Sequence, residues 1–247
     1  MNDPKEKVAV FESQCKEIGI TLSEKQIEQF LTYYEMLIET NKMMNLTAIT
    51  EFEEVLQKHF LDSISIVKAY QLSGKESVID VGTGAGFPGL PLKIVFPEMK
   101  IVLLDSLNKR LRFLNEVIDK LRLENISTIH GRAEDFGKDV NYREQFDLCL
   151  SRAVANLSSL SELCLPFVKV GGSFISYKSG QVDEEVKDAT RAIQLLGGKN
   201  TRVEKFELPD SDISRSFVVI SKAISTPKNF PRKAGIPTKK PILNKKN

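Results

Sequence analysis

The sequence predicts an α/β fold in which helices cover both faces of a doubly wound, mostly parallel sheet. Three observations support this prediction. Beyond residue 74, short apolar runs alternate with amphipathic segments, the pattern of repeated strand–helix units. The first of these runs leads into a glycine-rich turn, and the last two are separated by a turn at Pro209-Asp210, which indicates an antiparallel pair at one edge. The first seventy residues show helical patterns only.

The N-terminal helices form the first of three expected segments, a helical extension over 1–73. Ser23 and Gln26 make a capping-box pattern, and the apolar positions that follow recur at helical spacing. These positions are Ile27, Phe30, Leu31, Tyr34, Leu37 and Ile38. After a break at 41–45, two further helical stretches are expected before the boundary at Ser73-Gly74: 51–59, capped by Thr50, and 61–70.

The second expected segment, the sheet domain over 74–224, contains seven apolar runs of strand length. They are 78–81, 101–104, 126–130, 146–150, 172–177, 201–208 and 216–221. The helices expected between them are 88–95, 107–121 with Ser106 as its cap, 158–168 and 182–196. Because ligands of doubly wound sheets bind beyond the carboxyl ends of the strands, we expect the functional site where the segments after the first four strands meet.

The turn after the first strand predicts a nucleotide-type cofactor site. Gly82, Gly84 and Gly86 allow a sharp turn and a close approach of the backbone to a ligand, before a helix that begins near Pro88. A glycine turn without a ligand is the alternative interpretation.

The residues around this turn favour one cofactor over another. A dinucleotide-binding loop reads G-x-G-x-x-G, but Phe87 stands where its third glycine is expected. Asp80 places a carboxylate near the loop, where it suits the cationic end of an amino acid better than a pyrophosphate. The D-x-G-x-G-x-G pattern, followed by Asp105 at the end of the next strand, resembles class I S-adenosylmethionine-dependent methyltransferases. We therefore expect S-adenosylmethionine rather than NAD, with Asp105 accepting hydrogen bonds from the ribose hydroxyls.

Other polar residues are expected around the same crevice. Glu134, or the backbone beside it, follows the third strand and is placed to meet the adenine edge. Arg152, after the fourth strand, would face the crevice; surface ion pairs are the alternative for both side chains. His59 and Asp62 share a helix face and are expected to support the site through a hydrogen bond; the alternative is that they shape the site directly. Lys178 is a candidate contact for a phosphate or a base, or a solvated lysine at the rim.

The third expected segment, the tail over 225–247, carries seven basic residues and no acid. The chain has a net charge of +2, so without this +7 tail it would be −5. Four prolines are expected to keep the tail extended, with Arg232, Lys233, Lys239 and Lys240 available to RNA phosphates. The alternative is a solvated, disordered terminus without function.

Composition limits the remaining possibilities. No apolar run approaches the length of a membrane span, and the N-terminus lacks an apolar leader, so a soluble, cytoplasmic protein without a membrane partner is expected. Cys15, Cys149 and Cys164 are too widely spaced for a metal or redox motif, and no metal is expected. Sequence alone does not fix the oligomeric state, and a monomer is favoured.

Six segments, in order along the chain, resemble the bacterial ribosomal RNA small subunit methyltransferase G family. They are Asn45-Leu-Thr-Ala-Ile49, His59-Phe-Leu-Asp-Ser63, the loop 81–91, Gly131-Arg-Ala-Glu134, Ser151-Arg-Ala-Val-Ala155 and the terminal segment 231–242. The resemblance implies transfer of a methyl group from S-adenosylmethionine to N7 of the guanine at position 527 of 16S rRNA, in naked RNA or in the 30S subunit. It also implies cofactor contacts from Gly82, Phe87, Ala133, Glu134 and Arg152; Asp80 and Asp105 are added from the general methyltransferase pattern.

Two alternative functions stay open from sequence alone. A methyltransferase acting on a small molecule would leave the basic tail unexplained. A non-catalytic RNA-binding or ribosome-assembly factor would have the same fold without a working cofactor site. The intact glycine loop with Asp80 and Asp105 favours an enzyme.

Overall fold

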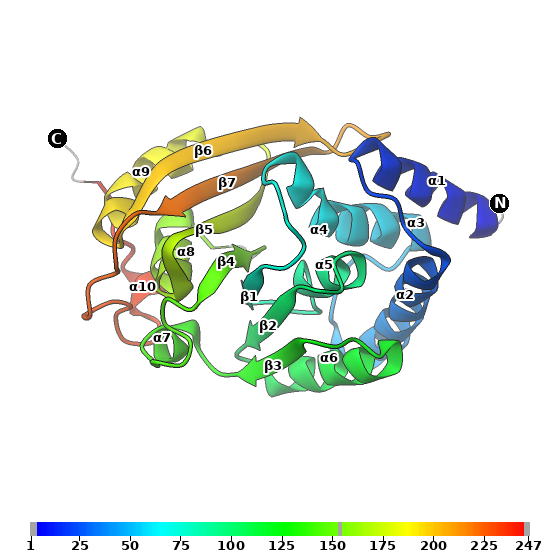
Figure 1. Cartoon of the computed structure of the whole chain (residues 1–247), viewed down its shortest axis with the longest axis horizontal. Coiled ribbons are helices and arrows are strands. Elements are labelled where there is room, and N and C mark those ends of the chain that lie inside the picture. Colours follow the sequence, from blue (N-terminus) through cyan, green and yellow to red (C-terminus); the bar gives the residue numbers. More distant parts are fainter. Residues whose placement is uncertain (1–3, 153–154, 245–247) are drawn as a thin grey trace.

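The computed structural model describes residues 4–152 and 155–244 and contains a seven-stranded sheet of order β3-β2-β1-β4-β5-β7-β6 (Figure 1). The strands are β1 (Ser77–Val81), β2 (Lys100–Asp105), β3 (Ile126–His130), β4 (Phe146–Ser151), β5 (Val168–Ser179), β6 (Gly198–Glu207) and β7 (Ser214–Lys222). The pairings among β1 to β5 are parallel, whereas β7 runs antiparallel to both β5 and β6. The predicted sheet and its antiparallel edge are therefore confirmed.

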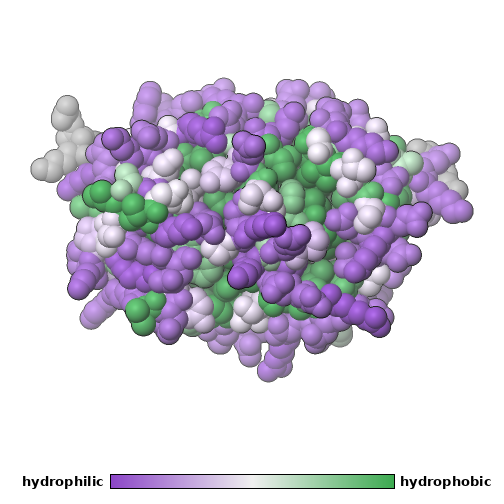
Figure 2. All heavy atoms as spheres, in the orientation of Figure 1, coloured by the Kyte–Doolittle hydropathy of each residue, from purple (hydrophilic) through white to green (hydrophobic). Residues whose placement is uncertain are grey.

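Two hydrophobic cores lie on opposite faces of this sheet. Neighbouring strand residues alternate between them, so that Val78 belongs to one core and Ile79 to the other. The first core packs against α1 (Pro4–Glu17), α2 (Glu24–Met44), α5 (Gly89–Val95) and α6 (Asn108–Leu121). The second packs against α8 (Leu157–Cys164) and α9 (Asp183–Leu195). Polar residues cover most of the face seen in Figure 2, with apolar side chains in narrower areas between them.

The N-terminal helices share the first core with the sheet rather than forming a core of their own. Phe30 and Leu37 of α2 are buried in the same cluster as Val78 and Leu103. The capping box at Ser23 and Gln26 is present as predicted. The division into three segments stays a prediction.

The helices expected at 51–59 and 61–70 form one continuous run. It consists of α3 (Phe52–Val55), a π-helical segment (Leu56–Leu61), α4 (Asp62–Ile64) and a 3-10 turn (Ser65–Lys68). Thr50 is not the cap, because α3 begins one residue later than expected, after Glu51, and no side chain caps it. The carbonyl of Thr50 instead accepts a hydrogen bond from the Tyr34 hydroxyl.

The predicted cap at Ser106 is also wrong. The helix α6 begins at Asn108, after Leu107, and no side chain caps it. Asp105 Oδ1 accepts a hydrogen bond from the Leu107 N–H, and this contact stabilises the turn between β2 and α6. The helix expected to end at 168 stops at Cys164, because a 3-10 turn containing Pro166 follows and β5 begins at Val168.

The described part of the tail includes a short helix, α10 (Ile236–Lys239), so the expectation of an extended segment is wrong (Figure 1). Arg143 holds its first part by donating to the carbonyls of Thr226 and Phe230. The Ser158 and Ser159 hydroxyls of α8 donate to carbonyls further along. These partners are distant in sequence, so local proline content did not reveal them.

Within the described ranges, 4–152 and 155–244, no helix is both long and apolar enough to cross a membrane.

Candidate active site

A cavity of about 320 Å³ opens at the carboxyl ends of the parallel strands, where the strand order reverses between β1 and β4. Its lining residues follow four neighbouring strands: Gly82 after β1, Asp105 at the end of β2, Ala133 and Glu134 after β3, and Ser151 and Ala155 at and after β4. The sequence predicted a ligand site at this edge, and four of its predicted cofactor residues, Gly82, Asp105, Ala133 and Glu134, meet here. We refer to this space as the cofactor cavity.

The glycine loop is held by backbone geometry that favours glycine. Gly82 and Gly84 have φ angles of 74° and 62°, in the left-handed region. The N–H of Gly82 donates to the Leu104 carbonyl, and the N–H of Gly84 donates to Asp105 Oδ2, at 2.9 Å in each case. The first two strands therefore fix the loop jointly.

A buried tyrosine of α2 stabilises the glycine loop through a hydrogen bond. The Tyr33 hydroxyl donates to the Ala85 carbonyl at 2.5 Å. A Cβ atom at position 86 would lie 2.7 Å from that hydroxyl oxygen, so only glycine fits there without displacement. The helical extension thus stabilises the conformation of the cofactor loop.

Asp80 lies beneath the loop rather than in the lining of the cofactor cavity. It is fully buried, and its Oδ2 accepts hydrogen bonds from the Thr83 hydroxyl at 2.7 Å and the Gly89 N–H at 2.9 Å. Among the described residues, its Oδ1 has no hydrogen-bond partner. Burial raises the pKa of Asp80 to about 6, although the hydrogen bonds from Thr83 and Gly89 oppose the rise. An unpaired carboxylate oxygen at this depth suits a donor such as an ammonium group.

Asp105 presents its carboxylate to the cofactor cavity. Its side chain is 4 % exposed, and Arg110 Nη1 lies 3.4 Å from Oδ2. Because carboxylate oxygens accept several hydrogen bonds, Asp105 can bind vicinal hydroxyls while still holding the loop. This position fits the predicted contact with a ribose.

The tail reaches the cofactor cavity beside Glu134. Glu134 Oε1 accepts a hydrogen bond from the Gly235 N–H at 2.7 Å, and Thr238 of α10 lines the cavity. The carboxylate predicted to meet adenine is therefore also the anchor of the tail. Ala133 and Glu134 begin the short helix α7 (Ala133–Phe136), which places both beside the cavity.

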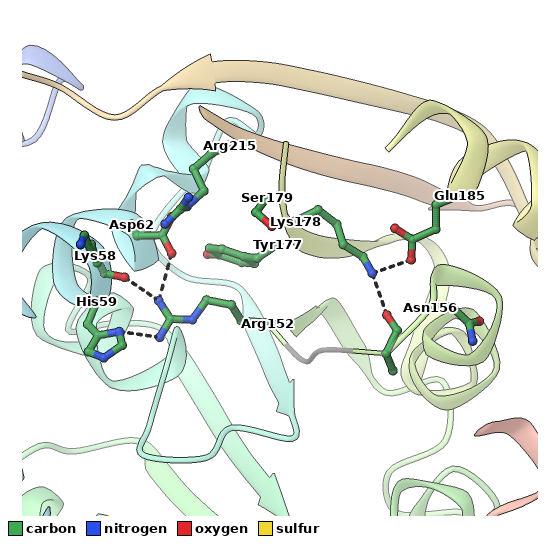
Figure 3. A pocket seen from close by; sticks show the side chains of 11 residues that line it. Lys58, His59, Asp62, Arg152, Asn156, Tyr177, Lys178, Ser179, Glu185 and Arg215 are labelled. Atoms are coloured by element: carbon green, nitrogen blue, oxygen red, sulfur yellow. Dashed lines mark hydrogen bonds and ion pairs between the residues drawn. The ribbon is translucent and has the colours of Figure 1, made fainter. Parts of the chain in front are cut away.

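Arg152 and Phe87, the other two predicted cofactor residues, are close to each other but absent from the cofactor-cavity lining. The Arg152 guanidinium lies 4.8 Å from the centre of the Phe87 ring, within the range of a cation–π contact. Arg152 Nη1 donates to Asp62 Oδ2 at 3.0 Å. Arg152 lines a second cavity of about 540 Å³, which Figure 3 shows from close by.

Ala155 lines both cavities, so the second cavity adjoins the cofactor cavity. Its lining also includes Tyr177 at the end of β5 and Arg215 at the start of β7. Arg215 Nε donates to Asp62 Oδ1 at 2.7 Å, so two arginines share one buried carboxylate. We refer to this space as the second cavity.

His59 is held as a neutral hydrogen-bonding side chain at the edge of the second cavity. Because arginine has no acceptor, Nδ1 must accept from Arg152 at 3.3 Å, and Nε2–H then donates to the Thr47 hydroxyl at 2.7 Å. Burial, and to a lesser extent the Arg152 charge, lower the pKa of His59 to about 3. The ring stacks on Phe87 at 4.5 Å. His59 and Asp62 therefore both hydrogen-bond to Arg152, and their part in the site stays a prediction.

The predicted RNA-binding residues occupy three different environments. Lys178 lines the second cavity and donates hydrogen bonds to the Ala155 carbonyl and to Glu185 Oε1. Arg232 makes an ion pair with Glu162, whose side chain is 1 % exposed, at 2.6 Å. Lys233, Lys239 and Lys240 are exposed on the tail.

Sequence reasoning missed several residues of the site. They are Tyr33, Arg110, Tyr177, Glu185, Arg215 and Thr238. Each comes from an element whose neighbours are set only by the folded sheet, so no local motif marks them. The one available signal was topological: an antiparallel strand after β5 brings its first residues beside the end of β5, which places Arg215 near Lys178.

Comparison with known proteins agrees with this geometry. The model of the family described as "rRNA small subunit methyltransferase G" matches residues 26–216. Relatives of that name are 53% identical in Lachnoclostridium phytofermentans, covering 96% of this chain and 98% of the relative, and 47% identical in Clostridium novyi, covering 98% and 100%.

Solved structures agree on the fold. A methyltransferase from Pyrococcus furiosus is similar with a TM-score of 0.54 and 16% identity, over 80% of this chain and 98% of that one. A protein from Agrobacterium tumefaciens described as "a predicted O-methyltransferase" has a TM-score of 0.52 and 16% identity, over 69% of this chain and 84% of that one. The fold is thus shared with these structures, and the family model and the two relatives show that the chain belongs to the rRNA small subunit methyltransferase G family.

Proposed function

We propose that this protein transfers a methyl group from S-adenosylmethionine to N7 of a guanine in 16S rRNA, at position 527 by family resemblance. The observation that supports this most is the pair of adjoining cavities that share Ala155. One has the loop and carboxylates suited to a nucleoside cofactor. The other is lined largely by polar and charged side chains and is large enough for a nucleobase.

The residues around the cofactor cavity fit S-adenosylmethionine. Asp105 would accept hydrogen bonds from the ribose hydroxyls, and Ala133 and Glu134 would lie beside the adenine. The unpaired Oδ1 of Asp80 supplies negative charge near Gly82, on the side suited to the amino-acid end. S-adenosylmethionine should therefore raise the melting temperature, because a ligand that binds only the folded state stabilises it, and NAD should not.

The reaction places modest demands on the protein. S-adenosylmethionine supplies an electrophilic methyl group on a sulfonium. Guanine N7 has an in-plane lone pair and no proton to lose, so no general base is needed. His59 matches this requirement, since it is neutral and both ring nitrogens are hydrogen-bonded. The protein's task is to hold the base and the methyl group in line and to exclude water.

Binding of the RNA is assigned to basic residues outside the cofactor cavity. Lys233, Lys239 and Lys240 project from a tail segment that itself touches the cofactor cavity through Thr238. Phosphate contacts there would place rRNA over the cavities. Arg232 supports this surface by fixing the tail to Glu162.

The proposal is tested by incubating the protein with methyl-labelled S-adenosylmethionine and 30S subunits or naked 16S rRNA, then mapping the label. We expect label at N7 of one guanine. Label on a small molecule of a cell extract, with none on rRNA, would instead favour a small-molecule methyltransferase. RNA binding without any cofactor binding would favour a non-catalytic assembly factor.

A further inference from the structure

A row of three polar groups lies along one wall of the second cavity. The Lys178 ammonium donates one hydrogen bond to the Ala155 carbonyl and another to Glu185 Oε1, each at 2.7 Å. Figure 3 shows Lys178 and Glu185 on one side of the Tyr177 ring, with Asp62 on the other. Because Ala155 also lines the cofactor cavity, the row starts at the junction of the two cavities and leads away from it.

Among the described residues, two hydrogen-bonding positions of this row have no partner and are open to a ligand. An ammonium group has three protons, and two of those on Lys178 are used within the row. Glu185 accepts from Lys178 and from the Leu157 N–H on the same oxygen, Oε1, and no hydrogen bond from another described residue reaches Oε2. Across the cavity, Asp62 already has an arginine on each oxygen.

We propose that Lys178 and Glu185 recognise the target base as guanine, with Lys178 donating to O6 and Glu185 Oε2 accepting from N1–H. This inference rests on the proposed methylation of guanine N7 and adds to it the residues that select the base. A base flipped out of its stack would enter the second cavity, as enzymes that modify bases require.

The order of groups in the row matches the order of groups around guanine. With N7 directed at the cofactor, at the Ala155 end, the next group around the purine is the acceptor O6 and the one after it is the donor N1–H. Lys178 and Glu185 present a donor and an acceptor in that same order. At the same two positions adenine carries an amino group, which is a donor, and an unprotonated N1, which is an acceptor. The amino group would face the Lys178 donor, and N1 would face the Glu185 acceptor, so neither hydrogen bond could form.

The charge of the pair favours a base over a phosphate. Glu185 lies in an ion pair with Lys178, so the two side chains together carry no net charge. An anion would gain little from Lys178 while facing the free oxygen of Glu185. A neutral base with adjacent acceptor and donor groups gains two charge-assisted hydrogen bonds.

The experiment compares the methylation of two bases by two proteins. The methylated guanosine of the small-subunit RNA is replaced by 2-aminopurine riboside, which keeps N7 and the 2-amino group but lacks O6 and N1–H. We expect the wild-type protein to methylate guanosine with a kcat/KM on the order of 10- to 100-fold above 2-aminopurine, after correction for the intrinsic reactivity of the two bases. In Glu185→Gln this preference should fall about 10-fold or more, because an amide can donate to the unprotonated N1.

Matched variants separate recognition from structure. Asp183→Asn alters another lysine–carboxylate pair at the start of α9, that of Asp183 with Lys205, which lies outside the second cavity, and should leave the preference unchanged. Lys178→Gln, which retains a donor for the Ala155 carbonyl, gives an independent comparison and should also reduce the preference. Calorimetric titration with S-adenosylhomocysteine should give unchanged affinity in each variant.

The outcomes distinguish this inference from the proposed function. If wild type methylates guanosine but Glu185→Gln and Lys178→Gln lower activity on both bases equally, or not at all, the pair does not read the base and the inference is wrong. If wild type binds the cofactor yet methylates no rRNA, the proposed function itself fails.

Discussion

The carboxylate of Glu134 accepts a hydrogen bond from the backbone N–H of Gly235, which joins the cofactor cavity to the basic tail. The tail, a candidate RNA-binding segment, therefore also contacts the cofactor cavity. Thr238, three residues further on, lines the cavity directly. Substitutions in the tail should therefore have two distinct effects. Those that disturb its packing should alter the cofactor cavity, and those that remove only charge should alter RNA binding.

Arg232→Gln should disturb packing. It leaves the buried carboxylate of Glu162 without its guanidinium partner, a change that we expect to cost about 3 kcal/mol of folding free energy. S-adenosylmethionine affinity should fall as well, because the segment that bears Gly235 and Thr238 loses its anchor. Urea denaturation and calorimetric titration measure the two effects. Lys233→Gln, beside it and exposed, is the control and should change neither.

Replacing Lys233, Lys239 and Lys240 together by glutamine should weaken rRNA binding without altering cofactor affinity. Each phosphate contact removed should flatten the slope of log affinity against log salt by about 0.7 to 0.9. Filter binding across a salt series measures this slope. The same replacement at exposed lysines of other helices, Lys16, Lys25 and Lys120, controls for net charge. Equal salt slopes for both triple variants would show that the tail lysines do not contact RNA phosphates.

Asp105→Asn should weaken S-adenosylmethionine binding by about 1 to 3 kcal/mol, because charge-assisted hydrogen bonds to the ribose are lost. The asparagine oxygen can still accept from the Gly84 N–H, so the loop should keep its conformation. Calorimetric titration gives the affinity, and Asp119→Asn on the exposed side of α6 is the control. An unchanged affinity in Asp105→Asn would show that this acid does not bind the ribose.

Asp80 should make the stability of the cofactor-free protein depend on pH. Burial raises its pKa from 3.8 to about 6, so the folded state retains a proton that the unfolded state has lost. The contribution of Asp80 to stability is therefore fully present below pH 4 and decreases as the pH rises through 6, by up to about 3 kcal/mol. The difference in unfolding free energy between wild type and Asp80→Asn, measured from pH 4 to 8, should follow this course. A difference independent of pH would contradict the raised pKa.

The sequence predicted the sheet well because strands and their ends are local patterns. The apolar run at 78–81 and the glycines after it predicted β1 and its turn. Asp105 was correctly expected beside that turn, because the carboxyl ends of parallel strands lie at the same edge of a sheet. The periodicity of 107–121 gave α6 but not its first residue, because Asp105 rather than Ser106 interacts with the turn before it.

The rest depended on contacts between distant segments. Arg152 was expected among the cofactor residues, but its direction is set by Asp62 and Phe87, which come from the start of α4 and the loop after β1. The tail was expected to be extended because of its prolines, whereas Arg143 and Glu162 hold it in place. Such partners are selected by the folded sheet and cannot be derived from neighbouring residues.

Methyl transfer to guanine N7 is tested by replacing that single atom of the substrate. Small-subunit rRNA is prepared with guanosine or 7-deazaguanosine at the position to which the methyl label maps. Each RNA is incubated with the protein and S-adenosylmethionine, and its nucleosides are then analysed by mass spectrometry. We predict 7-methylguanosine from the guanosine RNA and no methylated nucleoside from the 7-deaza RNA at that position. Methylation of the 7-deaza nucleotide, or of another atom of guanosine, would show that N7 is not the methyl acceptor.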